Sequence, residues 1–495
     1  MLWPKQQNLF PLTMPEKSPI TEQETKESFI ELHQINTTFL DTAPTLSSDS
    51  NNVVYRLYKR RFVGLVGLFI MNIITAMSWP WFGPISNNMV KEFGFTLDQV
   101  NWLGNIVSLM YMPVALMVPI VVSKYGMRRC CDIGAVTLLL SAWLRFSGTA
   151  KTLSRTESYA LIILGQFFAS IAQPIFQIMG PVYSERWFDL KGRTTATMIV
   201  AISNPLGGAV GQLLSPLVGD TRRSILILGI LSTAVVPFVF LVRDSPPIPP
   251  TFAGSKPSET LLSLLRAMSG LPTSPNARMT IRERVDFGIV SILFGTLVAG
   301  ANTFAVLSAQ VMQPAGYSAD ESGFMGACLL LSGIVAAIIT APLFDRVFTH
   351  HLALTAKILV PILAGAWLSL IWAVKPNNTG GLFAIMALIG ICSVVILPVG
   401  LELGCELTRN ANASSALLWF SGNLCAFVFI LSEGALRASP KADPPLNMRR
   451  ALIFNGTIIM ISAASVLFLQ GRQARKELDE QKVQRSLEIR RMEQP

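Results

Sequence analysis

The sequence predicts an all-α polytopic membrane protein with twelve transmembrane helices in two halves of six. First, the chain has 495 residues, of which 51% are apolar and only 14% are charged, whereas soluble domains carry about 25% charged residues. Second, apolar blocks recur that are long enough to cross a bilayer, which takes about 20 residues per helix. Third, one motif occurs in both halves. A soluble enzyme, a disordered chain and a nucleic-acid binder are poor fits.

The apolar blocks divide the chain into five parts. Residues 1–54 are polar without helical or strand period, so we expect a disordered tail. Residues 55–242 and 285–470 hold six apolar blocks each, and the proline-rich linker 243–284 cannot cross lipid. Residues 471–495 are dense in Lys, Arg and Glu and predict a charged, solvated tail. The blocks lie near 62–89, 100–122, 130–147, 157–183, 194–218, 224–242, 285–313, 322–344, 352–374, 381–407, 412–434 and 449–470.

The basic residues predict the orientation. If the N-terminus is cytosolic, 29 of the 40 Lys and Arg residues fall on the cytosolic side. Because short loops rich in Lys and Arg stay in the cytosol, we expect both termini there. The expected location is the plasma membrane or a vacuolar or lysosomal type of membrane, crossed many times.

A repeat relates the two halves. Gly94-Phe-Thr-Leu-Asp-Gln99 matches Gly316-Tyr-Ser-Ala-Asp-Glu321, 222 residues later. Each segment contains a capping box, in which a hydroxyl side chain and a Glu or Gln three residues on satisfy free N–H groups at a helix start. The second and eighth helices are therefore expected to be equivalent. Parallel six-helix repeats are the plan of major facilitator carriers, whose substrate site lies between the halves at mid-membrane.

One face of the fourth predicted helix carries three glutamines. Gln166, Gln173 and Gln177 are spaced seven and four residues apart, within a stripe about 40° wide. Amide side chains facing lipid would be very costly, so the stripe faces protein or a watery cavity. It either joins neighbouring helices by hydrogen bonds or forms a cavity wall. We assign Gln173 and Gln177 to a substrate site.

The first predicted helix contains Trp79-Pro-Trp-Phe-Gly-Pro84, whose prolines and glycine must loosen it. Trp79 and Gly83 share one face, and Trp81 points nearly opposite. A tryptophan face beside a kink, with amides opposite and no carboxylate, suits a small organic cation held by cation–π attraction, or a neutral amphiphile. The alternative is an interfacial aromatic belt, which fits Trp81 better than Trp79.

Intramembrane charges are scarce and therefore informative. Glu402 and Glu406 lie one turn apart near the expected cytosolic end of the tenth helix, and Arg409 follows them. We expect these three residues to form a cytosolic gate, and the alternative is a proton-binding site. On the eleventh helix Trp419 and Asn423 are also one turn apart and are candidate substrate contacts.

Signatures of catalysis are missing from the sequence. It contains no Walker loop, zinc-ligand spacing or nucleophile elbow, so we predict no catalytic residue, no metal and no cofactor in a protein that is not an enzyme. The vicinal Cys130 and Cys131 are expected to pack, with acylation as the alternative. The expected partners are a small-molecule substrate and the lipid bilayer, without nucleic acid, and we expect a monomer.

Four segments carry a resemblance to a known family. They are Arg56-Leu-Tyr-Lys-Arg-Arg61, Ser203-Asn-Pro-Leu-Gly207, Pro246-Pro-Ile-Pro-Pro250 and Pro398-Val-Gly-Leu-Glu-Leu-Gly-Cys-Glu-Leu407. In these segments the chain resembles the feline leukaemia virus subgroup C receptor-related carriers of the major facilitator superfamily, over about residues 55–469. The resemblance implies the twelve-helix major facilitator fold and transport of choline or ethanolamine, with haem and pyridoxine as further proposed cargo.

The resemblance also implies a ligand cage. Trp79 matches the first-helix tryptophan of the family's choline carriers, and Gln173 matches the fourth-helix glutamine. The seventh-helix tyrosine is Asn302 here, and the eleventh-helix glutamine is Asn423. Losing one aromatic wall weakens a quaternary-ammonium cage by roughly 0.5–2 kcal/mol, which makes choline itself a weaker expectation.

The resulting hypothesis is a facilitative carrier for a small organic solute, an organic cation or amine-like metabolite, in which the halves rock about a central site. Phe304 or Trp419 is the candidate substitute for the missing aromatic wall. Two alternatives stay open: a proton-coupled metabolite exporter that uses Glu402 or Glu406, and a membrane receptor or sensor that binds without transport.

Overall fold

The computed structural model describes residues 56–248, 250, 261–272, 278–346 and 352–472. All of them belong to one unit of the chain, Tyr55–Pro495. The expected disordered tail, 1–54, lies outside the described residues, as does nearly all of the charged tail, 471–495. Throughout the described ranges the regular elements are helices, which confirms the predicted all-α class.

The helices follow the apolar blocks in order. In the first half they are α2 (Arg61–Ala76), α3 (Ser86–Phe93), α4 (Leu97–Ser147), α5 (Arg155–Trp187), α6 (Leu190–Leu217), α7 (Thr221–Val235) and η1 (Val236–Leu241). The linker contains α9 (Leu261–Met268). In the second half they are α10 (Ile281–Met312), η3 (Gln313–Ala315), α11 (Ala319–Arg346), α12 (Leu352–Ala373), α13 (Thr379–Thr408), α14 (Ala411–Ala435), α15 (Arg449–Ala464) and η5 (Ser465–Phe468).

Ten of the described helices are long and apolar enough to cross a membrane, and α4 accounts for two crossings. Its 51 residues would span about 75 Å as a straight helix, far more than a hydrocarbon core of about 30 Å. Gly126 breaks it with φ 87°, a conformation that glycine adopts without strain. Together with the shorter α2, the helices are consistent with twelve crossings. Cys130 and Cys131 are buried in the second part of α4, as expected for packing residues.

The first crossing is broken where the prolines predict. Helix α2 ends at Ala76 and α3 begins at Ser86, and turns connect them. Gly83 in this connection lies directly against the second half, because a Cβ there would overlap the backbone oxygen of Ala305 in α10. The break is thus surrounded by protein, as a non-helical segment at membrane depth requires.

The repeat is confirmed at the helix starts. Helices α4 and α11 begin at Leu97 and Ala319, 222 positions apart. Gln99 Oε1 accepts from Thr96 N at 2.9 Å, and Gln99 N donates to Thr96 Oγ1 at 3.1 Å. The same reciprocal pair joins Ser318 and Glu321 at 2.7 and 3.1 Å. Both capping boxes are therefore formed.

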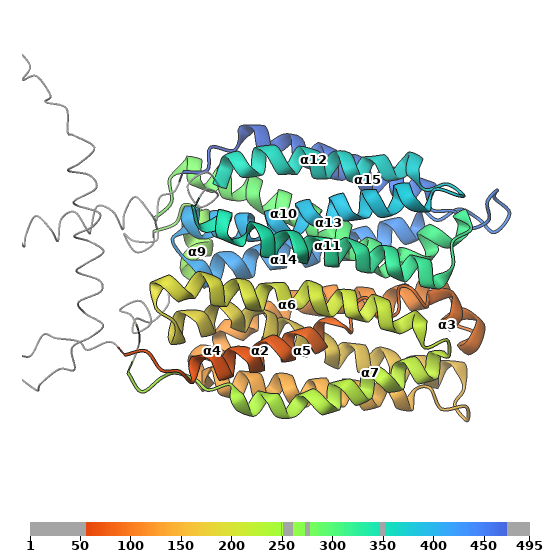
Figure 1. Ribbon diagram of the computed structural model, residues 1–495, viewed down its shortest axis with the longest axis horizontal. Coiled ribbons are helices and arrows are strands. Elements are labelled where there is room, and N and C mark those ends of the chain that lie inside the picture. The colour runs from red at the N-terminus through yellow and green to blue at the C-terminus, as the bar shows by residue number, and fades with distance from the viewer. Residues whose placement is uncertain (1–55, 249, 251–260, 273–277, 347–351, 473–495) are drawn as a thin grey trace, which may run out of the picture. The chain divides into compact units, whose positions relative to one another are not determined.

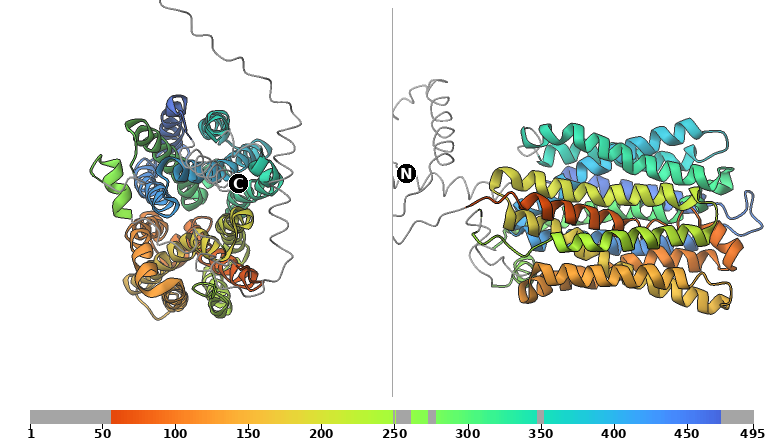
Figure 2. Two further views of the ribbon diagram at one scale, coloured as in Figure 1. Left: turned by 90° about the vertical axis from the view of Figure 1, so that its left-hand side faces the viewer. Right: turned by 60° about the horizontal axis from the view of Figure 1, so that its bottom comes forward.

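Each half has its own apolar core. In Figures 1 and 2 the helices of the first half, α2 to α7, lie on one side and α10 to α15 on the other. The halves meet mainly where α6 packs against α11 and α4 against α14. We call the end of the bundle at which α2 and α10 begin the proximal end, on the left in Figure 1, and the end at which α4 and α11 begin the distal end.

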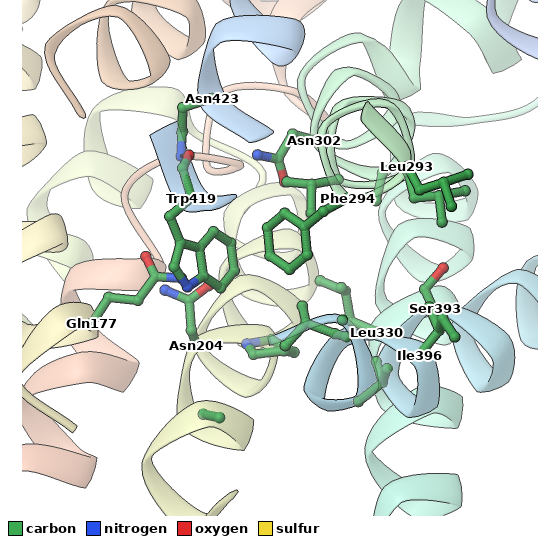
Figure 3. Close-up of a pocket in the computed structure, with 18 of the residues that line it drawn as sticks. Gln177, Asn204, Leu293, Phe294, Asn302, Leu330, Ser393, Ile396, Trp419 and Asn423 are labelled. Carbon is green, nitrogen blue, oxygen red and sulfur yellow. Dashed lines mark hydrogen bonds between the residues drawn. The ribbon is translucent and has the colours of Figure 1, made fainter. Parts of the chain in front are cut away.

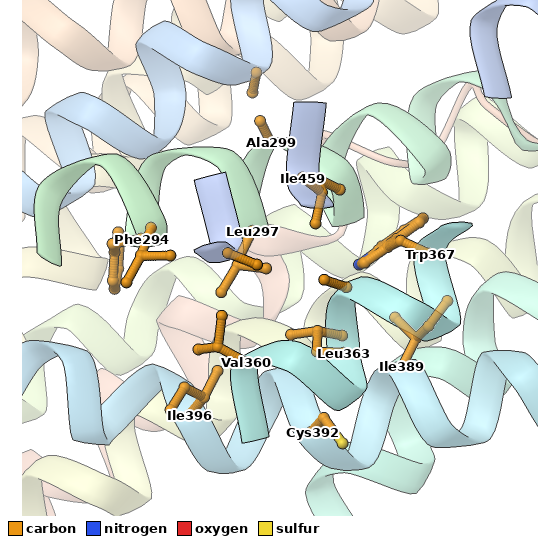
Figure 4. Packing of buried hydrophobic residues seen from close by; sticks show 14 of the residues in the cluster. Phe294, Leu297, Ala299, Val360, Leu363, Trp367, Ile389, Cys392, Ile396 and Ile459 are labelled. Atoms are coloured by element: carbon orange, nitrogen blue, oxygen red, sulfur yellow. The ribbon is translucent and has the colours of Figure 1, made fainter. Parts of the chain in front are cut away.

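The halves are packed tightly near the distal end. A Cβ on Gly104 of α4 would lie 2.7 Å from both Cγ atoms of Val306 in α10. A Cβ on Gly323 of α11 would lie 2.7 Å from the backbone oxygen of Gln212 in α6. In the second half, Phe294, Leu297, Val360 and Ile396 belong to the core and also face the space between the halves (Figure 4). The halves therefore touch distally and leave a cavity between them toward the proximal end.

Candidate functional site: a cavity between the two halves

A cavity lies between the two halves, with about 1390 Å³ of empty space when the solvent-filled opening is included. Helices α4, α5 and α6 of the first half line it together with α10 to α14 of the second. Its lining reaches Leu403 and Leu469, near the proximal ends of α13 and the last helix, and stops distally at Gly104 and Val306. The polar and aromatic lining residues are Trp79, Ser108, Tyr111, Gln173, Gln177, Asn204, Phe294, Asn302, Ser393, Trp419 and Asn423.

The structure brings together all six residues that the sequence assigned to substrate binding. They come from four different crossings and all line this cavity: Trp79, Gln173, Gln177, Asn302, Trp419 and Asn423. Asn302 and Asn423 point toward each other across the cavity (Figure 3). Their role in binding stays a prediction, because no ligand contacts them here.

The two neighbouring tryptophans have different surroundings. Trp79 is half-buried in the cavity wall, and Gly208 makes room for its indole, since a Cβ there would lie 3.3 Å from Trp79 Cζ2. Trp81 is 0% exposed, and its indole nitrogen donates to Ser224 Oγ at 3.1 Å. The aromatic-belt alternative is therefore wrong for Trp81, because a partner in α7 holds its ring inside the first half.

The glutamine stripe on α5 divides into two functions. Gln166 is 0% exposed and receives a hydrogen bond from Arg145 Nη1 at 2.9 Å. Its own amide nitrogen donates to the backbone oxygens of Ser78 and Leu103 at 3.1 and 2.9 Å. Gln166 thus joins neighbouring helices by hydrogen bonds. Gln173 and Gln177, seven and eleven residues further along α5, line the cavity instead. The two interpretations of the stripe each apply to a part of it.

An aromatic group near the middle of the cavity includes two residues that the sequence argument missed. The Trp419 ring is edge-on to Phe294, with centroids 5.2 Å apart, and its centroid is 6.5 Å from that of Tyr111 on α4. In Figure 3 the amide groups of Gln177 and Asn204 point toward Trp419. Trp419 thus forms an aromatic part of the cavity wall, and its role as the substitute wall stays a prediction.

Phe304, the other candidate for that wall, is not in the cavity. It is 3% exposed and packs at a centroid distance of 6.2 Å against Trp367 in the core of the second half. This expectation was wrong because helical spacing does not tell which face of α10 meets the first half. Tyr111 carried a weak signal, since it shares a helical face with Ser108, and so did Asn204, a polar residue inside the apolar block 194–218 and the quoted segment Ser203–Gly207, whereas Phe294 carried none.

Several polar atoms of the cavity wall have no hydrogen-bonding partner among the described residues. They are Tyr111 Oη, Gln173 Oε1, Gln177 Oε1, Asn204 Nδ2 and Ser393 Oγ. Leaving such groups unsatisfied costs about 1–3 kcal/mol each. A solute that accepts and donates hydrogen bonds, or ordered water, would recover that free energy on entering.

The described residues that line the cavity carry no charged side chain. An anion would find no cationic partner there, and burying it unpaired would be costly. A cation would be stabilised by the faces of Trp79, Trp419 and Tyr111 and by amide oxygens. The wall therefore suits a small cation or a neutral polar solute.

The predicted gate residues lie at the proximal end with a partner that the sequence did not identify. Arg409 ends α13, and its Nη2 is 2.6 Å from Glu283 Oε1 at the start of α10. Glu406 is 6% exposed, and Glu402 is half-buried on the same helix. Glu283 also closes a capping box with Thr280 at 2.7 and 3.2 Å. That box is readable in the sequence, but its ion pair with a residue 126 positions away is not.

Comparisons with known proteins agree with this architecture. The family model of the Major Facilitator Superfamily matches residues 68–431. The choline/ethanolamine transporter FLVCR2 of Homo sapiens is 24% identical over 461 residues, which are 87% of this chain and 82% of the relative. Solute carrier family 49 member A3 of Danio rerio is 26% identical over 83% of this chain and 86% of the relative.

A solved structure, that of D-xylose-proton symporter, has the same fold. It matches with a TM-score of 0.61 at 10% identity and covers 83% of this chain and 98% of that chain. The predicted likeness to the feline leukaemia virus subgroup C receptor-related carriers is confirmed by the named relatives. The family model matches most of the chain, the helices are apolar, and the relatives are named as transporters rather than enzymes. The chain therefore belongs to the Major Facilitator Superfamily of multi-pass membrane transporters.

Proposed function

We propose that this transporter carries a small organic cation or amine-like metabolite across its membrane by facilitative alternating access. The observation that supports the proposal most is the cavity between the halves. Aromatic rings and amide atoms without hydrogen-bonding partners line it, and its described lining residues carry no charged side chain. Trp79 supplies a cation–π surface, and Trp419 with Tyr111 supplies a second one. Gln173, Gln177, Asn302 and Asn423 orient the solute by hydrogen bonds.

The names of the relatives favour the same substrate class. Those of Homo sapiens and Felis catus are choline/ethanolamine transporters. Because Asn302 replaces an aromatic residue in the family's choline cage, we infer a substrate that makes more hydrogen bonds than a quaternary ammonium does. Ethanolamine, a primary amine with a hydroxyl, fits this description better than choline.

The proposed cycle follows from the two ends of the bundle. In the described conformation the halves touch near Gly104 and Val306, and the cavity extends toward the proximal end. We propose that the proximal end is cytosolic, with both termini there, and that rocking of the halves exposes the site to the other side. Glu402, Glu406 and Arg409 serve the cytosolic gate. We expect a monomer in the plasma membrane or a vacuolar or lysosomal type of membrane.

Counterflow in proteoliposomes tests this function. Vesicles loaded with unlabelled ethanolamine are expected to accumulate labelled ethanolamine transiently and saturably, because a carrier exchanges solute faster than it leaks. Choline is expected to exchange more slowly. Protein-free vesicles are the control, and absence of accumulation with both amines would contradict the proposed substrate class.

The same vesicles distinguish the two alternatives. An imposed pH gradient is expected to leave the exchange rate unchanged, since the cavity wall offers no carboxylate among the described residues. A rate that follows the gradient would favour the proton-coupled exporter, with Glu402 or Glu406 as the titrating group. Saturable binding of ethanolamine without any flux would favour the receptor or sensor.

A further inference from the structure

A second pocket lies between the halves at the distal end. It is separate from the central cavity, has about 520 Å³ of empty space and is formed by α4 on one side and α14 on the other. From α4 it is lined by Asp98, Asn101, Trp102 and Asn105, and from α14 mainly by aliphatic residues. Nothing in the proposed transport cycle so far uses these side chains.

The polar residues of this pocket form a ladder along α4. Asp98, Asn101 and Asn105 are spaced three and four residues apart, so they lie on one face of the helix. Ser108, the next residue of the same face, lines the central cavity. The ladder therefore ends about one helical turn from a residue of the proposed substrate site, on the same face of α4.

Asn105 is the residue that points to a ligand. It is 0% exposed, and neither its amide nitrogen nor its amide oxygen has a hydrogen-bonding partner among the described residues. A buried amide with neither group satisfied is costly and rare in folded proteins. Since Asn105 lines the distal pocket, a molecule in that pocket would satisfy it.

An arginine beside the pocket joins the two halves. Arg437, just after α14, places Nη2 2.6 Å from Asp98 Oδ1 of the first half. Its Nη1 donates to Gln310 Oε1 of the second half at 2.8 Å, and Gln310 in turn donates to Asn101 Oδ1. The guanidinium thus occupies the position at which a cationic ligand would meet the Asp98 carboxylate.

The chemistry of the pocket suits an organic ammonium ion. Asp98 is the one charged residue among its lining residues, Asn101 and Asn105 offer amide oxygens, and Trp102 adds an aromatic face that is 37% exposed. We propose that the distal pocket is a second binding site for a small organic cation, which displaces Arg437 from Asp98 and so releases a contact that holds the halves together distally. The choice of a cation rests on the proposed function, whereas the pocket and its bridge do not.

Charged thiol reagents test the site in purified protein, without any measurement of transport. In the Asn105→Cys variant we compare two methanethiosulfonates of similar size, one with a trimethylammonium group and one with a sulfonate. For each variant we take the ratio of the reaction rate of the cationic reagent to that of the anionic reagent. This ratio is expected to be on the order of tenfold larger in Asn105→Cys than in an exposed control, because the Asp98 carboxylate concentrates cations in the pocket. The control is Lys151→Cys, on an exposed distal loop, and the parent protein corrects for native cysteines.

Two further variants identify the groups responsible. Adding Asp98→Asn is expected to lower the cationic-to-anionic rate ratio to that of the Lys151→Cys control. Adding Arg437→Gln is expected to accelerate the reaction of the cationic reagent, since the guanidinium that competes for Asp98 is gone. Tetramethylammonium is expected to protect the introduced thiol. If Asn105→Cys does not fold, Leu431→Cys on the α14 wall of the pocket serves in its place.

A cationic-to-anionic rate ratio equal to that of the Lys151→Cys control would overturn the proposal. So would a raised ratio that Asp98→Asn leaves unchanged. Absence of reaction with the cationic reagent at both pocket positions would also overturn it. Loss of ethanolamine counterflow with an intact charge preference would instead contradict only the transport function, so the two failures are distinguishable.

Discussion

Trp79→Ala is expected to reduce ethanolamine counterflow at subsaturating concentration about 30-fold with only a small loss of thermal stability. A desolvated cation–π contact contributes about 2 kcal/mol, and each 1.4 kcal/mol is a factor of ten in binding. The half-buried indole lines the cavity and touches the apolar core of the second half from that wall, so its removal leaves the core of the first half intact. Initial exchange rates in proteoliposomes, with thermal unfolding of the purified variant in parallel, measure both effects.

Trp81 is the matched control two residues away. Trp81→Phe removes the hydrogen bond from its indole to Ser224, which is worth about 1 kcal/mol, and part of the buried ring volume, but it keeps an aromatic ring in the core. Exchange is expected to stay near the parental rate while stability falls slightly. Equal exchange by Trp79→Ala and the parent would remove Trp79 from the binding site.

Gln166→Leu is expected to destabilise the protein by about 3–5 kcal/mol. Arg145 is 1% exposed, and the Oε1 of Gln166 accepts from its guanidinium. The substitution takes that partner from a buried charge and removes the side-chain donor to two backbone oxygens, those of Ser78 and Leu103. Ser78 belongs to the broken first crossing, and Leu103 and Arg145 lie on either side of the break in α4, so the loss affects four crossings, including that of Gln166 itself. Thermal or denaturant unfolding in detergent measures it.

Gln173→Leu, on the same face of the same helix, is the control for that experiment. Its Oε1 has no partner in the described chain and faces the cavity, so its removal is expected to weaken ethanolamine exchange and to leave stability nearly unchanged. If both substitutions lowered stability equally, the division of the glutamine stripe into a structural and a binding part would be incorrect.

The transmembrane order was predictable because each crossing must satisfy its own backbone in lipid. Apolar length and the paired capping boxes at Thr96 and Ser318 located the helices and the repeat, and the prolines located the break after Ala76. Gln173 and Gln177 could be proposed because polar side chains avoid lipid, which leaves only protein or a cavity for them to face. Trp79 was proposed from the kinked aromatic segment, and Asn302 only from the family resemblance.

Tertiary neighbours were not predictable from spacing. Gln166 and Gln173 share a face, and only the position of Arg145 decides that one is structural. Tyr111 enters the site because α4 crosses α14 near Trp419, and Glu283 meets Arg409 because α10 and α13 pack together. The last two pairs join segments more than a hundred residues apart, and even Gln166 and Arg145, 21 residues apart, lie on different helices.

The central claim is that the two halves rock about the cavity between them, and spin-label distances test it most directly. One pair, at Lys151 and Lys375, labels exposed distal loops of the two halves, and a second pair, at Lys124 and Arg278, labels exposed proximal positions. Double electron–electron resonance with saturating ethanolamine is expected to add a population with a longer distal and a shorter proximal distance than in the described conformation. Two results would contradict the account. One is a change in the same direction at both ends; the other is a single distance for each label pair that ethanolamine does not alter.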